Sequence, residues 1–236
     1  HSISELEVGK SLRKILLQNK GMTLVTTYPS NIARVTGIIN EANSLNKKIV
    51  MSGRQMSKFL SIAKASGYLH SINNIIDNDE ISKFKREEIV VLASGCDGEY
   101  EEAVRNIVEN HDPYIKILPG DCVIFSSKIT ARNSGNLASL IKKMKESGAS
   151  VITDRDNLVH VQPHATEEDI RSMYKALQPK ICIPVHGTDL HINQHTIVAK
   201  ECGIPYVVKV CNGDVVAINM KEPKVIASVA HGTLKI

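Results

Sequence analysis

Three histidines stand where short apolar runs give way to turn-forming residues, and such side chains could bind a metal or transfer a proton. His160 and His164 lie in the stretch HVQPHATEED, and His186 follows the apolar run ICIPV and precedes Gly187. A surface histidine at His164 and a structural one at His186 fit the same patterns. Pro163 disfavours the helix that a metal-binding pair at His160 and His164 would need, so the pattern indicates presentation from a loop.

A second pair, His191 and His195, is spaced i, i+4 on a predicted helix and could hold a metal on one face. No Glu completes an HExxH motif there, so a solvated helix face is the favoured interpretation. The chain also has no GxGxxG, GxxxxGK[ST] or GxSxG sequence, the usual signs of a dinucleotide enzyme, a P-loop enzyme and a serine hydrolase. The residue pattern therefore indicates a phosphate or metal site without a complete ligand set.

The elements that must position these residues alternate short β-branched runs with helical segments, which is typical of a parallel α/β fold. Strands are predicted at 22–27, 48–51, 88–94, 121–127 and 150–153, and helices at 31–46, 54–67, 100–110 and 137–148. Ligands of such sheets collect beyond the carboxyl ends of the strands, where helix N-termini favour phosphate. The loops TYPSN, MSGRQ, ASGCDGE and SSKIT are candidates, with ordinary turn and cap residues as the alternative for each.

After about residue 155 the rhythm changes, which predicts a second structural part joined near residues 154–159. Helices are predicted at 166–177 and 189–202, and strands at 181–185, 206–210, 213–219 and 224–230. The last three strands are expected to be antiparallel. Thr166 and Asp169, three residues apart before an apolar run, predict a capping box at the start of the first of these helices.

Composition limits the classes of function. The apolar runs are too short to span a bilayer, and five cysteines without a CxxC pair indicate the reduced thiols of a cytoplasmic protein. A net charge of +4 permits a polyanionic partner. Because aromatic residues make up only 4% of the chain and Trp is absent, phosphate and backbone contacts rather than base stacking would dominate any binding of nucleic acid.

Seven segments, in order, resemble successive landmarks of the ribonuclease J family, a bacterial member of the β-CASP branch of the metallo-β-lactamase superfamily. They are TLVTTYPSNIARV, VMSGRQM, VVLASGCDGE, PGDCVIFSS, HVQPHATEED, IPVHGTD and NGDVV. The resemblance covers essentially the whole chain. It implies that residues 1–153 form a parallel-sheet β-CASP domain and that residues 154–236 form the C-terminal part of a metallo-β-lactamase αββα domain.

The resemblance also implies roles for individual residues. His164 matches the β-CASP histidine that donates a proton or stabilises the transition state beside the scissile phosphate. His186 matches a family zinc ligand. Contacts to RNA are expected from the β-CASP surface and from the loop before His164, namely from Ser30, Asn31, Ser94, Gly95, His160, Val161, Gln162 and Pro163.

The activity implied is that of a zinc-dependent ribonuclease that cuts RNA internally or from its 5′ end, in a homo-oligomer or together with a paralogue. The family's HxHxDH motif is absent here, which implies a fragment that is inactive alone. Gln162 and Pro163 also replace the family's usual Ser-Gly, and Pro163 has no amide hydrogen to donate to RNA. A non-catalytic RNA- or phosphate-binding module and a DNA-directed β-CASP nuclease are the alternatives.

Overall fold

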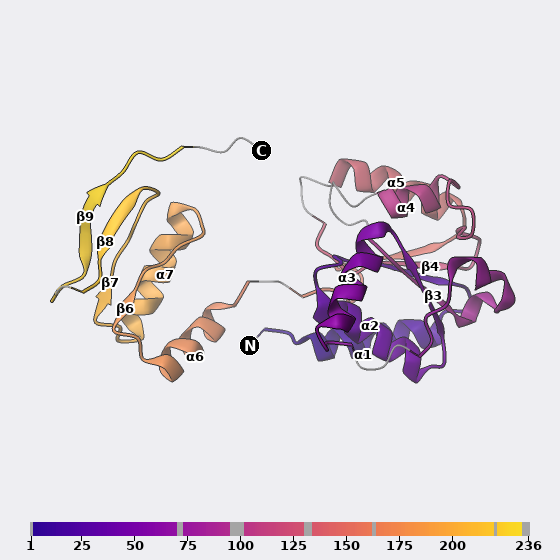
Figure 1. The fold of residues 1–236 in the computed structure, drawn as a ribbon, viewed down its shortest axis with the longest axis horizontal. Helices are drawn as coiled ribbons and strands as arrows, with labels where there is room; N and C mark the ends of the chain where they lie inside the picture. The colour runs from indigo at the N-terminus through magenta and orange to yellow at the C-terminus, as the bar shows by residue number, and fades with distance from the viewer. Residues whose placement is uncertain are drawn as a thin grey trace. The chain divides into compact units, whose positions relative to one another are not determined.

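The computed structural model describes residues 2–69, 73–94, 102–129, 134–161, 164–219 and 221–232. It divides into two compact units, one of residues 3–162 and one of residues 163–236 with residues 1–2 (Figure 1). The boundary after residue 153, which the family resemblance implies between the β-CASP domain and the metallo-β-lactamase part, stays a prediction. Residues 154–161 nevertheless belong to the first unit, and Val159 is completely buried in its core.

The first unit is built on a five-stranded parallel sheet in the order β2-β3-β1-β4-β5. The strands are β1 (Thr23–Thr26), β2 (Lys48–Ser52), β3 (Ile89–Ala93), β4 (Cys122–Phe125) and β5 (Ser150–Ile152). Every residue of the three central strands is buried, as expected for apolar runs in a sheet covered on both faces. The predicted α/β class and the predicted strands are confirmed.

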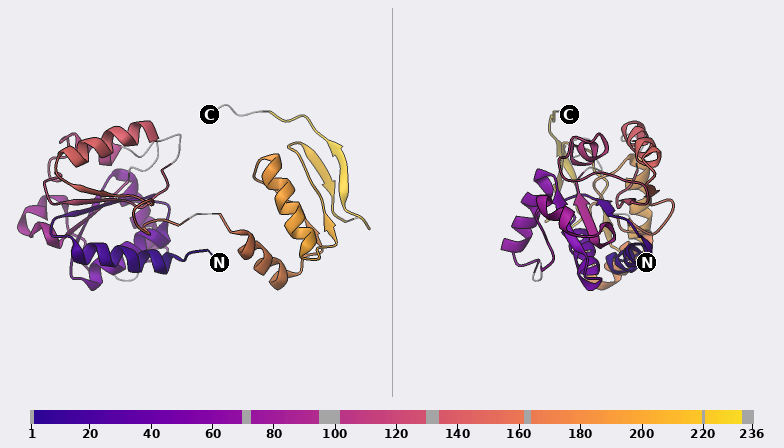
Figure 2. Two further views of the ribbon diagram at one scale, coloured as in Figure 1. Left: turned by 180° about the vertical axis from the view of Figure 1, so that it is seen from behind. Right: turned by 90° about the vertical axis from the view of Figure 1, so that its right-hand side faces the viewer.

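Helices cover both faces of this sheet (Figures 1 and 2). One face carries α1 (Glu5–Gln18), α2 (Ile32–Ser44) and α3 (Arg54–Ala65), and the other carries α4 (Glu102–Val108) and α5 (Ser134–Glu146). The 3₁₀ turns η1 (Asn78–Lys83) and η2 (Arg86–Glu88) lead into β3. Successive strand residues point to opposite faces, so Leu24 joins the core under α4 and α5 while Val25 joins the core under α1 to α3.

The second unit contains α6 (Glu167–Leu177), β6 (Ile181–Cys182), α7 (Asp189–Glu201), β7 (Tyr206–Val207), β8 (Asp214–Ala217) and β9 (Lys224–Ser228). β8 and β9 are antiparallel, as predicted, whereas β7 pairs in parallel with β6. The antiparallel expectation was wrong for β7 because α7 connects the two strands as a crossover, which returns the chain in the same direction. None of the helices in the described part of the chain is long and apolar enough to cross a bilayer.

The predicted capping box of α6 is confirmed. The Asp169 carboxylate accepts hydrogen bonds from the Thr166 amide at 3.0 Å and from the Thr166 hydroxyl at 2.7 Å. These hydrogen bonds contribute to a pKa of the Asp169 carboxyl that lies well below its ordinary range, with the hydroxyl of Ser2 as the first cause and Thr166 as the second. The start of the helix that follows His164 is therefore fixed locally.

Candidate functional site

Three residues expected to contact RNA, Ser30, Asn31 and Ser94, follow the carboxyl ends of the neighbouring strands β1 and β3. Thr26 of β1 is in register with Ala93 of β3 and with Phe125 of β4, so the segments that follow these strands start side by side. From β1 the chain continues to α2 on one face of the sheet, and from β4 it continues to α5 on the other. Open parallel sheets bind ligands at such a topological switch point.

The side chains predicted to contact RNA at this edge differ in their exposure to solvent and in their hydrogen bonds. Ser30 is exposed, whereas Asn31 is the N-cap of α2 and its side-chain oxygen accepts a hydrogen bond from the Arg34 amide at 3.1 Å. Ser94 is only 4% exposed, and a Cβ at Gly53 would lie 2.4 Å from its Oγ. Gly53 also has a positive φ of 101°, so both space and backbone require glycine there.

Sequence reasoning missed the polar interior of this edge, whose centre is Arg34. This side chain is 2% exposed and makes two hydrogen bonds to the Glu5 carboxylate, from Nε at 2.6 Å and from Nη2 at 3.0 Å. Its Nη1 donates to the carbonyl of Val159 at 2.9 Å and to Ser126. The sequence did carry one sign of this burial. Arg34 lies on the apolar stripe of α2, one turn before Ile38, and a buried cation needs polar partners there.

His160 follows Val159 and is half-buried. Within the residues that the structure describes, neither ring nitrogen has a hydrogen-bond partner and both are shielded from solvent. Burial lowers the pKa of this imidazole, and the nearby Arg34 lowers it further, while Asp154 and Glu5 oppose the shift. His160 is therefore held in a place that favours its neutral form. Gly95, Gln162 and Pro163 lie outside the described residues.

This environment predicts how stability depends on pH. Because the pKa of His160 is lower in the folded chain than its ordinary value near 6.5, the unfolded chain binds more protons between those two pKa values. Stability should be full above about pH 6.5 and should fall as the pH drops toward the lowered pKa. We expect His160→Gln to flatten this dependence in urea unfolding.

In the second unit the structure brings His164 and His186 together. Their ring centroids are 5.8 Å apart with planes inclined by 29°, and both residues are exposed. His186 has a positive φ of 64°, a backbone conformation that side chains other than glycine rarely adopt and that is often found at functional sites. Two exposed histidines from separate segments thus lie next to each other, and His186 has a strained backbone.

The other histidine pair, His191 and His195, makes hydrogen bonds to neighbouring side chains. His191 is exposed and its Nδ1 lies 2.9 Å from the hydroxyl of Thr188 at the start of α7. His195 is half-buried, and its Nε2 lies 2.5 Å from the hydroxyl of Tyr174, which also contacts the Cys182 thiol at 3.0 Å. Burial raises the pKa of Tyr174. The expected solvated face was wrong for His195, because α6 packs against α7 at this point.

The fit of a metal can be judged from the donor atoms present. Across the described ranges, no group of three or more His, Cys, Asp and Glu side chains could hold a metal ion. A hydrolytic zinc site takes three protein ligands. His186 supplies one imidazole, so these residues do not by themselves fit a complete zinc site.

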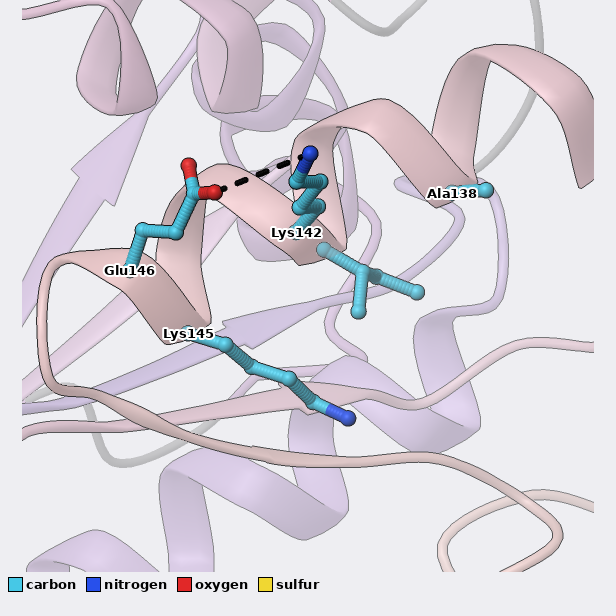
Figure 3. A pocket seen from close by; sticks show the side chains of 5 residues that line it. Ala138, Lys142, Lys145 and Glu146 are labelled. Carbon is cyan, nitrogen blue, oxygen red and sulfur yellow. Dashed lines mark ion pairs between the residues drawn. The ribbon is translucent and has the colours of Figure 1, made fainter.

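A surface hollow of about 520 Å³ lies elsewhere, along α5 (Figure 3). Its described lining comes from this single helix and consists of Ala138, Ile141, Lys142, Lys145 and Glu146. The ammonium group of Lys142 forms an ion pair with Glu146 at 3.8 Å. None of the residues predicted to do chemistry lies on this helix, so the hollow is separate from the candidate site.

Comparison with known proteins agrees with the fold of the first unit. The sequence resemblance implied a parallel-sheet β-CASP domain in the first part of the chain. The family model described as "Ribonuclease J, beta-CASP domain" matches residues 20–144. This span runs from just before β1 into α5. The chain belongs to the ribonuclease J family.

Curated relatives align with almost the whole chain. Ribonuclease J of Sinorhizobium meliloti is 28% identical over 233 residues, which are 99% of this chain and 41% of the relative. Ribonuclease J of Helicobacter pylori strain 26695 is 30% identical over 203 residues, 86% of this chain and 30% of the relative. Ribonuclease J of Synechocystis is 29% identical over 232 residues, 97% and 36% of the two chains. The chain thus spans between 30% and 41% of the length of these relatives.

Proposed function

We propose that this chain is the RNA-clamping β-CASP domain and the returning part of the metallo-β-lactamase domain of a ribonuclease J-type enzyme. The complete enzyme would be zinc-dependent and would act as a homo-oligomer or with a paralogue, and this chain alone would be inactive. The observation that carries the proposal is the pairing of His164 with His186 at 5.8 Å, in a chain of this family.

The chemistry of phosphodiester hydrolysis assigns different tasks to the two histidines. The departing oxygen needs a proton, and the exposed imidazole of His164 can donate one to a phosphate placed beside it. Bound zinc would activate water and neutralise charge on the phosphate, and His186 would be one of its ligands. The remaining ligands would have to come from a segment that carries the family's HxHxDH motif.

RNA would be held chiefly through its backbone. Exposed Ser30 and the side-chain NH₂ group of Asn31 offer polar groups at the switch point of the first sheet, and the backbone of segment 160–161 is the further proposed contact. Contacts of this kind position a nucleic acid without reading its sequence. Preference for RNA over DNA would then depend on contacts to the 2′-hydroxyl.

The thin core of the second unit supports the inactivity of this chain alone. Its buried cluster comprises Cys182, Ala199 and Ile204, packed with Tyr174 and Val207. Large apolar side chains remain exposed on its helices and strands, including Met173, Leu177, Val185, Leu190, Ile218 and Ile226. So small a core rarely stabilises a domain of this size. We infer that a further polypeptide segment, the rest of the metallo-β-lactamase domain, completes this unit in the active enzyme.

Zinc content and RNase activity test the proposal. We expect a version extended upstream through the HxHxDH region to bind about two zinc ions per chain and to cleave RNA, whereas this chain should do neither. In the extended version His164→Ala should lower the cleavage rate by about 10²–10⁴-fold, because a positioned proton donor contributes that much. His191→Ala is the matched control, since the Nδ1 of His191 is hydrogen-bonded to Thr188, the N-cap residue of its helix, and the variant should keep nearly full activity.

Three outcomes would count against this assignment. Metal-dependent cleavage by the present chain, lost on His164→Ala, would disprove its inactivity. If the extended version also fails to cleave, a non-catalytic RNA- or phosphate-binding module becomes the better assignment, a candidate favoured by the lack of a metal-binding cluster in the part that the structure describes. Preference for DNA over RNA of the same sequence would instead indicate a DNA-directed nuclease.

A further inference from the structure

We propose that Arg34 is a positioning residue, whose guanidinium fixes the backbone at Val159 and thereby places His160 and Val161 at the carboxyl edge of the sheet. The inference rests on the proposed function, in which His160 and Val161 contact RNA. It adds a residue that lies on α2, far from that segment in the sequence.

The contacts of Arg34 join three separate parts of the first unit. The carboxylate of Glu5 on α1 binds the guanidinium through both oxygens. On the other side, Nη1 lies 3.2 Å from the carbonyl oxygen of Ser126, 2.6 Å from its hydroxyl and 2.9 Å from the carbonyl oxygen of Val159. The side chain of Arg34 therefore connects α1, the end of β4 and the segment that leads to His160.

The geometry around Val159 leaves its carbonyl oxygen little freedom. The Ser126 hydroxyl donates to that oxygen at 2.6 Å while it accepts from Arg34, so the three groups close a small ring of hydrogen bonds. The planar guanidinium is held in place by its two bonds to Glu5, and hydrogen bonds from a charged donor are stronger than neutral ones. The Val159 side chain is completely buried as well.

His160 depends on this anchor more than an ordinary side chain would. Within the described chain its ring nitrogens have no hydrogen-bond partner, so no polar contact of the ring sets its position. Val161 packs against the same core as Val159. The positions of both residues therefore follow from the backbone that Arg34 and Ser126 hold.

If Arg34 only stabilised the fold, a buried guanidinium with its ion pair would not be required at this position. A buried ion pair must recover the cost of removing two charges from water, and well-packed apolar residues often stabilise a protein equally well. What an apolar side chain cannot do is fix the direction of one carbonyl group at a topological switch point. The fork of Arg34 makes that connection.

The experiment compares Arg34→Lys, Arg34→Met and Ser126→Ala with Arg86→Met, a control whose guanidinium binds Asp121 and lies near the other end of the sheet. Hydrogen exchange is measured at the Val159 amide, which donates to the Asn157 carbonyl at 2.8 Å, and at the Val91 amide in β3 as a reporter of global unfolding. NMR follows the imidazole signals of His160, and fluorescence anisotropy measures the affinity for a labelled single-stranded RNA.

In the Arg34 and Ser126 variants we expect exchange at Val159 to become about ten-fold faster relative to exchange at Val91, with shifted His160 signals and weaker RNA binding. Arg34→Lys should not restore the wild-type signals, because lysine keeps the charge but lacks the planar fork. Arg86→Met should leave the ratio of the two exchange rates unchanged. Should Arg34→Met fail to fold, Ser126→Ala removes one member of the ring with a smaller loss and gives the same comparison.

The proposal is overturned if exchange at Val159 and Val91 rises by the same factor in every variant, or if the His160 signals keep their wild-type positions in the lysine variant. A wild-type chain that does not bind RNA would count against the proposed function alone. Local changes at Val159 and His160 in the variants would then still show that Arg34 positions this segment.

Discussion

Arg34→Ala is expected to lower the free energy of unfolding of the first unit by about 3–5 kcal/mol, because it breaks an ion pair whose arginine is buried and also removes several hydrogen bonds from a charged donor. The Arg34 side chain is 2% exposed, and its loss would remove two hydrogen bonds from the Glu5 carboxylate and one each from the carbonyl groups of Ser126 and Val159. Urea unfolding followed at the β3 amide signals would measure the change. The expected direction is a lower midpoint with an unchanged slope.

The matched control is Arg13→Ala on the neighbouring helix α1. Arg13 also pairs with a glutamate, Glu41, at 3.3 Å, but its side chain is 40% exposed. Exposed pairs contribute about 0–1 kcal/mol, so this variant should unfold almost like the wild type. Equal losses in the two variants would mean that burial of Arg34 does not determine the energy of its ion pair.

The sheet of the first unit was predictable because the middle of each strand is apolar. Runs such as Ile89–Ala93 carry no polar residue, and a strand buried on both faces needs none. Strand order and partners were not predictable to the same degree. β7 shows why, since two residues, Tyr206 and Val207, pair with β6 and a local pattern of that length does not encode parallel or antiparallel pairing.

The sequence identified candidate residues of the site, but it did not predict the contacts that these residues make. Ordered landmarks pointed to His164 and His186, yet their approach to 5.8 Å depends on how α6 and β6 fold between them. Asn31 and Ser94 were expected to be free for RNA, whereas one caps a helix and the other is buried against Gly53. The roles proposed for these residues remain predictions.

Arg34 and its partners could not be found by reading motifs. A single arginine in an amphipathic helix is usually exposed, and only the folded chain brings Ser126 and Val159 within reach of it. The separation is large in sequence, 92 residues to Ser126 and 125 to Val159. Local propensity carries no information on such pairs, so the positioning contacts are the part of the site that requires a structure.

Asp121→Ala is expected to lower the free energy of unfolding by about 3–5 kcal/mol as well, at the opposite edge of the same sheet. The Asp121 carboxylate is 1% exposed and accepts hydrogen bonds from the amides of Met22 at 2.8 Å and Leu118 at 2.7 Å. It also binds the guanidinium of Arg86, with Nε at 3.1 Å. The loss of this carboxylate would leave the two amides without their acceptor and would break the ion pair of Arg86, which keeps its hydrogen bond to the Lys116 carbonyl. Urea unfolding would measure the cost.

Asp112→Ala provides the comparison for Asp121. The Asp112 carboxylate accepts from the amides of Tyr114 at 2.9 Å and Ile115 at 2.8 Å but is only half-buried, so about 1 kcal/mol is expected. Because Asp121 lies at the amino ends of β1 and β4, its removal should leave the His160 signals and the RNA affinity of the folded chain unchanged. A shift of His160 in Asp121→Ala would show that the two edges of the sheet are coupled, and that Arg34 is not the local determinant of the carboxyl edge.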